Sequence, residues 1–221
     1  MYSVIFDFVK KYLENNNGEV CSAFGHFPFR KRSEHIKRVF MWAQRLMEDD
    51  NSIDREVVLM AALFHDIGYA KSDLPENISH AENSAYLCRR YLSENGYETS
   101  FIEFVTYLVN NHSSKELLYQ KDTPIELITL IEADLLDETG ALSIMWDCMM
   151  EGAQEIQTFE KTFNHILNYS YKSMNKNPMV TSRARQFWND KQVLTKEFIK
   201  HLSFDIGIEH KISLGYSCLR D

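Results

Sequence analysis

The chain has 221 residues, of which 44% are hydrophobic and 25% charged, and its formal net charge is −8. These values are typical of a globular protein and argue against disorder, while the acidic balance argues against non-specific nucleic-acid binding. Eight glycines and four prolines are too few for a β-sandwich or barrel with a turn every ~8–12 residues. The longest apolar run, residues 57–64, is far shorter than the roughly 20 residues that cross a membrane. With no secretory signal visible, we expect a soluble, cytoplasmic, mainly helical protein.

Apolar residues at helical spacing, together with capping residues, predict a succession of helices. We expect helices at residues 2–13, 33–47, 54–64, from 79, from 100, from 123, through 146, 154–171 and 182–201. Ser33, Asp54 and Thr123 are the expected caps, and Ser100 with Glu103 fits a capping box. The fold class is all-α. We expect one domain over residues 1–221, with residues 33–140 as its core and helices within 154–205 packing on it. The tail after residue 205 has no assigned structure.

The cysteines and the short basic spots carry no functional signal of their own. The four cysteines form no CxxC pair, and nothing indicates an oxidising compartment, so we expect free, mostly buried thiols. These are Cys21, Cys88, Cys148 and Cys218. Residues 30–32 and 89–90 are interpreted as solvated surface. An anionic substrate must therefore find its positive charge locally.

Six ionisable side chains lie on the apolar faces of five predicted helices, where hydrophobic residues belong. They are His35, His65, Asp66, His80, His112 and Asp134. One such histidine alone is more often a hydrogen-bonded core residue, and one such aspartate is often a cap or an ion-pair partner. An unpaired carboxylate in an apolar interior is unfavourable, however, and no buried Lys or Arg is apparent. A divalent cation would satisfy all six together, so the pattern indicates a metal site, with packed core histidines as the alternative.

The adjacent pair His65 and Asp66 strengthens the metal hypothesis. Neighbours within a helix point about 100° apart, but at a helix end the backbone can turn both toward one ion. Gly68, two residues later, fits such a helix end.

The order His35, His65-Asp66, Asp134 resembles the signature of the HD superfamily of metal-dependent phosphohydrolases. Residues 63–69, LFHDIGY, are similar to its central motif. Residues 80–85, 111–113 and 132–137 resemble accessory motifs of a bacterial branch that includes nucleotide pyrophosphohydrolases. The resemblance spans about residues 33–140, and it implies an all-α bundle with a central metal site. The branch that cleaves cyclic dinucleotides carries a GYP motif, which is missing here, so that activity is not expected.

The resemblance implies that His35, His65, Asp66 and Asp134 hold the metal. Two imidazoles and two carboxylates leave octahedral positions open, which favours Mn, Fe, Co or Mg over zinc. The ion would lower the pKa of a water, and metal-bound hydroxide would attack phosphorus. Asp66, His80 and His112 are the expected catalytic residues. In the interpretation that we prefer, one ion is bound and the two histidines orient water and donate a proton. In the other, they hold a second ion that Asp66 bridges.

Four more residues are expected around this centre. Arg38, one turn after His35, and Lys71, in the loop after the HD pair, are expected to bind substrate. Their alternatives are an exposed pair with Glu34 and a solvated lysine. Glu82 and Asp137 are expected to contact the metal ligands rather than the metal itself, and Asp137 to fix the orientation of a ligand histidine. A carboxylate in a first helical turn, such as Glu82, is also favourable in any helix. No role is assigned to the other histidines, His26, His165, His201 and His210.

We therefore expect a metal-dependent phosphohydrolase acting on a nucleotide or another small phosphorylated metabolite, without nucleic-acid or membrane partners. Cleavage of a triphosphate into monophosphate and pyrophosphate competes with removal of a 5′-phosphate by a 5′-nucleotidase-type phosphomonoesterase. A non-catalytic nucleotide- or metal-binding module is the second class, and a purely structural helical protein is the third. The sequence does not define the base, the sugar, the number of phosphates or the oligomeric state.

Overall fold

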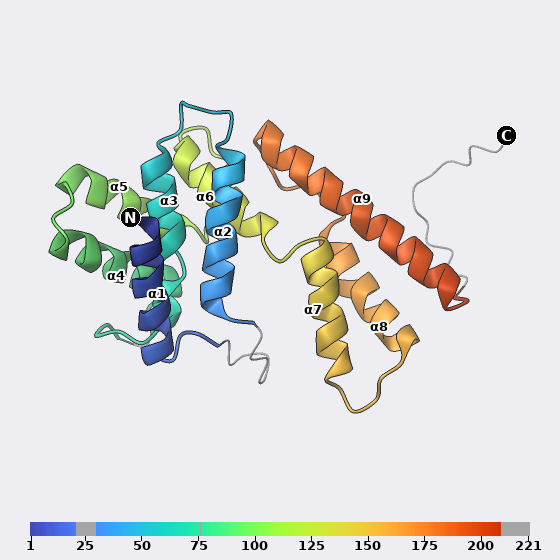
Figure 1. Ribbon diagram of the computed structural model, residues 1–221. Coiled ribbons are helices and arrows are strands. Elements are labelled where there is room, and N and C mark those ends of the chain that lie inside the picture. The colour runs from blue at the N-terminus through green and yellow to red at the C-terminus, as the bar shows by residue number, and fades with distance from the viewer. Residues whose placement is uncertain (21–29, 76, 209–221) are drawn as a thin grey trace. The chain divides into compact units, whose positions relative to one another are not determined.

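The structure is a computed structural model that describes residues 1–20, 30–75 and 77–208 (Figure 1). In these residues every regular element is helical, apart from one isolated bridge between Val20 and Lys31, and this confirms the all-α class. The elements are α1 (Tyr2–Asn15), α2 (Arg32–Leu46), α3 (Arg55–Phe64), η2 (Ile67–Tyr69), α4 (His80–Glu94), α5 (Thr99–Asn111), η3 (Lys115–Tyr119), α6 (Ile125–Leu136), α7 (Ala141–Gly152), α8 (Phe159–Ile166), η4 (Leu167–Tyr171) and α9 (Ser182–Asp205).

The described residues group into two compact units. The first comprises Met1–Glu138 and Pro178–Trp188, and the second comprises Thr139–Asn177 with the described residues from Asn189 onward. Helix α9 begins in the first unit and continues in the second. The expectation of one domain over the whole chain stays a prediction.

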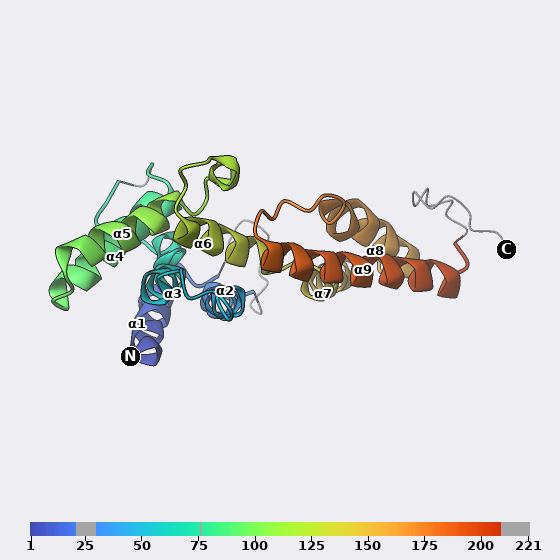
Figure 2. The ribbon, with the colours of Figure 1, turned by 90° about the horizontal axis from the view of Figure 1, so that it is seen from above.

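In the first unit α3 is the central helix. All eight residues of Val57–Phe64 are buried, and α3 contacts α1, α2, α4, α5 and α6. Figure 2 shows α2 and α3 nearly end-on and side by side. A helix that is apolar around its whole circumference has to be enclosed by others. The end of α3 therefore lies inside the unit, and this is where the HD pair follows.

Two helix starts in this unit are fixed by side chains that local sequence identifies. Asp54 accepts hydrogen bonds from the backbone N–H groups of Glu56 and Val57, as predicted. At the start of α4, Ser79 and Glu82 form a capping box. Each cap satisfies backbone donors that the first helical turn leaves without partners.

The predicted caps at Ser33, Ser100 and Thr123 are wrong. Helix α2 begins one residue before Ser33, which is buried and donates its backbone N–H to the Glu19 carboxylate over 3.1 Å. Helices α5 and α6 begin close to the predicted positions but without a side-chain cap. The partner of Ser33 is a carboxylate from an earlier segment, Glu19, so the residues next to the helix do not predict this contact.

The second unit is built on α7, α8 and the later part of α9. Its core residues are Ile144, Phe163, Ile166 and Ile199. Gly140 precedes α7 with a φ of 66°, a conformation that favours glycine. The predicted helix over residues 154–171 is wrong at its start, because α8 begins only at Phe159, with Thr158 as its cap.

Two further expectations concern the thiols and the membrane. Cys88 is free and buried as expected, whereas Cys148 is free but exposed. Cys21 and Cys218 lie outside the described residues. In the described part of the chain no helix is both long and apolar enough to span a membrane.

Candidate metal centre

The HD pair lies at the point where α3 ends and a short 3₁₀ helix begins. His65 follows α3 with helical backbone angles, whereas Asp66 has φ −114° and ψ 8°. This backbone conformation is sparsely populated and changes the direction in which successive side chains point. Both side chains are buried, and His65 Nε2 lies 3.7 Å from Asp66 Oδ2.

Gly68 allows η2 to pass directly against the first turn of α4. A Cβ at this position would collide with the carbonyl oxygen of His80 and the backbone nitrogen of Ser84. The Gly68 N–H donates to Ser84 Oγ over 2.8 Å, and the Asn83 side-chain amide donates to the Gly68 carbonyl over 2.8 Å. These contacts hold His80, the first residue of α4, next to Asp66.

Four side chains from two helices and the HD turn lie close together, and we call them the quartet: His35, His65, Asp66 and Asp134. His35 Nε2 lies 3.2 Å from His65 Nε2, 3.4 Å from Asp66 Oδ2 and 3.2 Å from Asp134 Oδ1. His65 Nε2 lies 3.7 Å from Asp66 Oδ2 and 4.0 Å from Asp134 Oδ1. Ligand atoms that each lie ~2.0–2.2 Å from one ion are separated from one another by about 3–4 Å. The ligand atoms of His35, His65 and Asp66 lie close enough together to hold a metal ion, and Asp134 Oδ1 lies beside the two histidines.

Three histidines direct Nε2 toward Asp66, while Nδ1 of each has a partner elsewhere. His35 Nδ1 lies 2.7 Å from Asp137 Oδ2. The Nδ1 atoms of His65 and His112 lie 2.8 and 2.6 Å from the carbonyl oxygens three residues earlier. An acceptor at Nδ1 keeps a proton on that atom, so that each ring, when neutral, carries its lone pair on Nε2. We infer this tautomer from the contacts, and it is the one that binds metal through Nε2.

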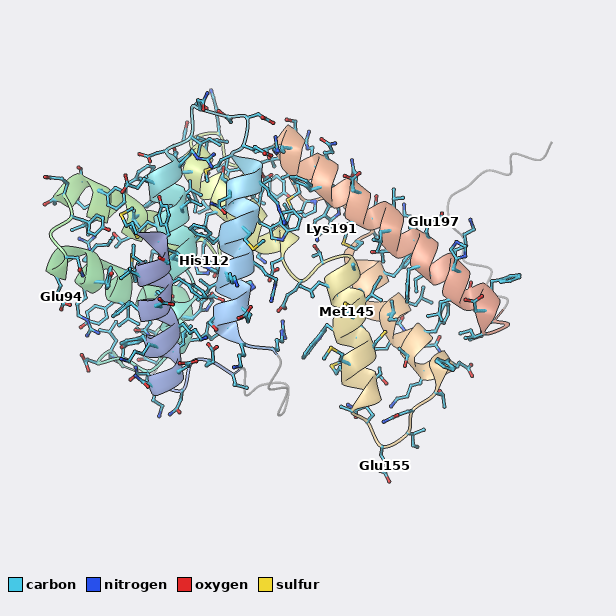
Figure 3. The ribbon with its side chains drawn as sticks, viewed as in Figure 1. Glu94, His112, Met145, Glu155, Lys191 and Glu197 are labelled. Atoms are coloured by element: carbon cyan, nitrogen blue, oxygen red, sulfur yellow. The ribbon has the colours of Figure 1, made fainter. Side chains whose placement is uncertain are left out.

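The two oxygens of Asp66 face different neighbours. Oδ2 faces the quartet, while Oδ1 lies 3.5 Å from His112 Nε2 and 3.7 Å from His80 Nε2. Ser113 Oγ lies 3.1 Å from His80 Nε2 and 3.2 Å from His112 Nε2. In Figure 3 the labelled His112 lies among the helices of the first unit. Asp66, His80 and His112 thus form a second group that can hold a cation or handle protons.

Behind His35 lies a network of carboxylates and guanidinium groups. Arg38 Nε donates to Asp137 Oδ1 over 2.8 Å, and Arg38 also pairs with Glu138 over 3.3 Å. Arg30 Nε donates to Glu138 over 3.1 Å. His35, Asp137 and Glu138 come close enough to hold an ion, but these two arginines already neutralise both carboxylates. Arg38, expected to bind substrate, is engaged here, and Asp137 contacts a quartet histidine as expected.

Burial and charge act in opposite directions on the titratable groups. Burial favours a lower pKa for His35, but hydrogen bonds to Asp134 and Asp137 outweigh it and raise the pKa to about 10. Burial lowers the pKa of His65 to about 4. Burial favours a higher pKa for Asp134, but its contact with His35 brings the pKa down to about 2. Burial also favours a higher pKa for Asp66, but the neighbouring histidines and Arg32 outweigh it and hold that pKa well below its usual range. Ionised carboxylates therefore favour a cation at His35 Nε2.

The structure does not bring Glu82 and Lys71 to the quartet. Glu82 is exposed, and its carboxylate accepts from the backbone N–H and the hydroxyl of Ser79 over 2.9 and 2.8 Å. It therefore acts as a helix cap. Lys71 is exposed and lines a pocket of about 290 Å³ together with Tyr69 and Asn83.

The sequence pattern does not indicate that Arg32, Tyr69 and Ser113 lie at this site. Arg32 was interpreted as solvated surface, but its Nη1 lies 2.7 Å from Asp66 Oδ2. The Tyr69 ring stacks on the His80 ring, with 4.4 Å between centroids. The one signal for Arg32 is its position three residues before His35, which places both on one face of α2.

The first unit is thus a helical unit in which His and Asp side chains lie close enough together to hold a metal ion. Residues 32–139 match the family model of the HD domain. Residues 32–139 therefore form an HD domain, and this match confirms the predicted family resemblance. The HD domain implies a divalent metal, and His35, His65 and Asp66 form a cluster that could bind one. A search among curated protein sequences gave no match.

Several solved structures have a similar fold. An HD-superfamily hydrolase from Bacillus thuringiensis is 24% identical with a TM-score of 0.66, and the match covers 94% of this chain and 97% of that one. A predicted HD-superfamily hydrolase from an uncultured Thermotogales bacterium is 20% identical with a TM-score of 0.64, covering 93% and 92%. Bacillus subtilis YpgQ in complex with ADP is 21% identical with a TM-score of 0.60, covering 95% and 99%.

Proposed function

We propose that the protein is a metal-dependent phosphohydrolase that acts on a nucleotide or a similarly small phosphorylated metabolite. The observation that carries this proposal is the convergence of imidazole Nε2 atoms and carboxylate oxygens on one point. Histidine tautomers fixed at Nδ1 and carboxylates with low pKa values prepare these atoms to bind a cation.

His35, His65, Asp66 and Asp134 would hold the ion, and Asp137 would orient His35 from behind. When bound, the ion supplies a Lewis acid for phosphoryl oxygens and lowers the pKa of a water toward neutrality. Two imidazoles and two carboxylates favour Mn, Fe, Co or Mg. The protein's own contribution is to fix these side chains in a buried site, so that little reorganisation is needed during the reaction.

His80 and His112 would move protons at this centre. Their Nε2 atoms lie on the Oδ1 side of Asp66, and the Ser113 hydroxyl lies within hydrogen-bond distance of both. One ring can orient a water, and the other can donate a proton to the leaving oxygen. We prefer this one-ion arrangement.

One observation favours a second arrangement with two ions. His112 has its Nδ1 fixed by a carbonyl oxygen in the same way as the quartet histidine His65. When the ring is neutral, its Nε2 therefore carries the lone pair that a metal ligand requires. In this arrangement Asp66, His80 and His112 would together hold the second ion.

A nucleotide is the substrate class that the comparison with YpgQ supports, because that protein was crystallised with ADP. Cleavage to monophosphate and pyrophosphate and removal of a single phosphate are both compatible with this chemistry. A cytoplasmic location and the absence of nucleic-acid partners stay predictions.

The test measures metal content and product release on the same purified samples. We expect at least one equivalent of metal after reconstitution with Mn, and hydrolysis within a panel of nucleoside mono-, di- and triphosphates. Chelation should abolish the activity, and added Mn should restore it. Product chromatography then distinguishes pyrophosphate from phosphate release. Tight nucleotide binding without turnover would indicate a binding module, and metal below about a tenth of an equivalent would contradict the metal centre itself.

A further inference from the structure

An apolar groove lies in the second unit, between α7, α8 and the later part of α9. Its volume is about 550 Å³, and residues of the second unit alone line it. Phe159, Phe198 and Leu202 supply its large apolar side chains, and the free thiol of Cys148 also lines it. The groove therefore offers a surface that is separate from the residues of the HD domain, which end at position 139.

The polar side chains of this groove already have partners in the backbone. Gln157 Nε2 donates to the carbonyl oxygen three residues earlier over 3.2 Å. Thr158 Oγ1 accepts from the backbone N–H of Lys161 over 3.1 Å, and Thr162 Oγ1 donates to a carbonyl oxygen over 3.2 Å. The Phe159 side chain, in contrast, is 79% exposed. A groove with engaged polar groups and exposed aromatic surface favours an apolar occupant over a phosphate.

Helix α9 ends beside this groove in a Schellman motif. Gly207 has a φ of 67° and donates its N–H to the Phe204 carbonyl over 3.1 Å, and the Ile208 N–H donates to the Ser203 carbonyl over 3.0 Å. These are the two hydrogen bonds that define this kind of helix end. Ile208 also packs against the same core cluster as Leu202, which lines the groove. The chain that follows Ile208 therefore starts close to the groove.

Residues 209–221 lie outside the described residues, but their sequence shows what chemistry they carry. Residues 212–218 read ISLGYSC, so that Ile212, Leu214, Tyr216 and Cys218 alternate with serine and glycine. A period of two places these four side chains on one side of an extended segment. Residues 209–221 can span roughly 40 Å when extended, whereas Leu202 and Phe198 are separated by only about 6 Å along α9. The segment is therefore long enough to follow the groove.

We propose that residues 212–218 bind this groove as an extended segment of the same chain, with their alternate apolar side chains against Phe159, Phe198 and Leu202. Residues 209–211 form the tether in this arrangement. A short tether gives the segment an effective concentration of about millimolar, which a separate apolar molecule has to exceed. The proximity of the tether favours this occupant over a second copy of the chain.

The experiment measures how fast iodoacetamide alkylates Cys148 in the full chain, by mass spectrometry of the peptide that contains it. The thiol is exposed in the described residues, so a segment bound in the groove should protect it. Leu214→Asp places a charge in the apolar row, and Ser213→Asp is the matched control with the same charge on the other side. Loss of one buried leucine side chain shifts an equilibrium by about 10- to 100-fold. We expect Leu214→Asp to raise the alkylation rate by this factor, and Ser213→Asp to leave it at the wild-type value.

A second pair of variants tests the groove itself. Phe198→Ser removes part of its wall, and Val193→Ser is the control, since Val193 is exposed on the same helix without lining the groove. We expect a faster reaction of Cys148 in Phe198→Ser and the wild-type rate in Val193→Ser. If Phe198→Ser fails to fold, the comparison of Leu214→Asp with Ser213→Asp still decides.

Three results would overturn the inference. One is an alkylation rate that is the same in wild type and Leu214→Asp, because the segment would then not cover the groove. Another is an equal increase in Leu214→Asp and Ser213→Asp, because the alternation would then not matter. The third is protection of Cys148 that weakens on dilution together with a dimer mass in light scattering. That result would assign the groove to a second copy of the chain.

Discussion

Two groups of described residues combine a histidine with buried carboxylates, one in each compact unit, and they are arranged differently. In the first unit, Nε2 atoms from different helices point toward the oxygens of Asp66 and Asp134. In the second unit His165 lies between two carboxylates. Its Nε2 is 3.3 Å from Asp147 Oδ1, and its Nδ1 is 2.9 Å from Glu151 Oε1.

The direction of the ring nitrogens distinguishes a metal site from an ion-pair network. Both nitrogens of His165 face carboxylates on opposite edges of the ring, so a protonated ring can donate to both at once. Further polar groups complete this network, because the Ser170 hydroxyl donates to Asp147 and Lys161 Nζ lies 3.3 Å from Glu151 Oε2. The quartet instead gathers lone pairs at one point. The same residue types therefore form two kinds of site.

Removing Asp66 should have the largest effect, because its two oxygens join both halves of the first site. We expect Asp66→Ala to reduce bound metal below about a tenth of an equivalent and to abolish hydrolysis. It should also lower the melting temperature, since metal binding contributes to folding stability. Elemental analysis and thermal unfolding test this, with the exposed Asp50→Ala as control. A full metal complement in Asp66→Ala would contradict the ligand assignment.

His112→Ala decides between one ion and two. If His112 handles a proton, metal content should stay at the wild-type level while kcat falls by ~10²–10⁴-fold. KM should change little, because proton transfer is an interaction of the transition state. If the site holds two ions, wild type should carry about two equivalents and the variant about one. If His112 only packs in the core, stability should fall with activity per folded molecule unchanged. Metal stoichiometry and kcat are measured on the same samples, and we expect the first result.

Asp137→Asn tests how much the support behind His35 contributes. Asparagine keeps an oxygen that can accept the Nδ1 proton of His35 but removes the negative charge. Loss of such a partner typically weakens metal affinity by about 10- to 100-fold. We expect this loss in a calorimetric titration with Mn, with the exposed Asp73→Asn as control. Wild-type affinity would show that the contact with His35 does not support metal binding.

The pH dependence of metal affinity follows from the raised pKa of His35. At pH values below its pKa of about 10 the His35 ring is protonated, so a metal ion must displace one proton from it. His65, with a pKa of about 4, is already neutral at pH 7 and releases none. Between about pH 7 and 9 we therefore expect the affinity to rise about tenfold per pH unit, with one proton released. Titrations in two buffers of different ionisation enthalpy measure that proton, and a pH-independent affinity would contradict the charge state of His35.

How much could be predicted from the sequence depends on where each partner lies. Periodicity places His35, His112 and Asp134 on buried helix faces, because the face of a helix is a property of its own residues. It does not reveal which groups meet across elements. Arg32 pairs with a carboxylate 34 positions later, and Arg30 with one 108 positions later. Such contacts depend on how the helices pack, and no local pattern encodes them. In the same way, the family motif that contains Glu82 does not distinguish a helix cap from a residue that supports the ligands.

A change in the second unit should have the smallest effect on bound metal. It directly tests whether the two histidine–carboxylate groups differ in function. His165→Gln removes the ring that bridges Asp147 and Glu151, leaving two carboxylates without their shared partner. Buried groups that lose a hydrogen-bond partner cost about 1–3 kcal/mol of the free energy of unfolding. We expect this loss in denaturant unfolding, with metal content and kcat per folded molecule unchanged. If residue type decided the function, the variant would lose metal as the quartet variants do. A fall in metal stoichiometry in His165→Gln would therefore show that ring-nitrogen direction does not separate the two groups.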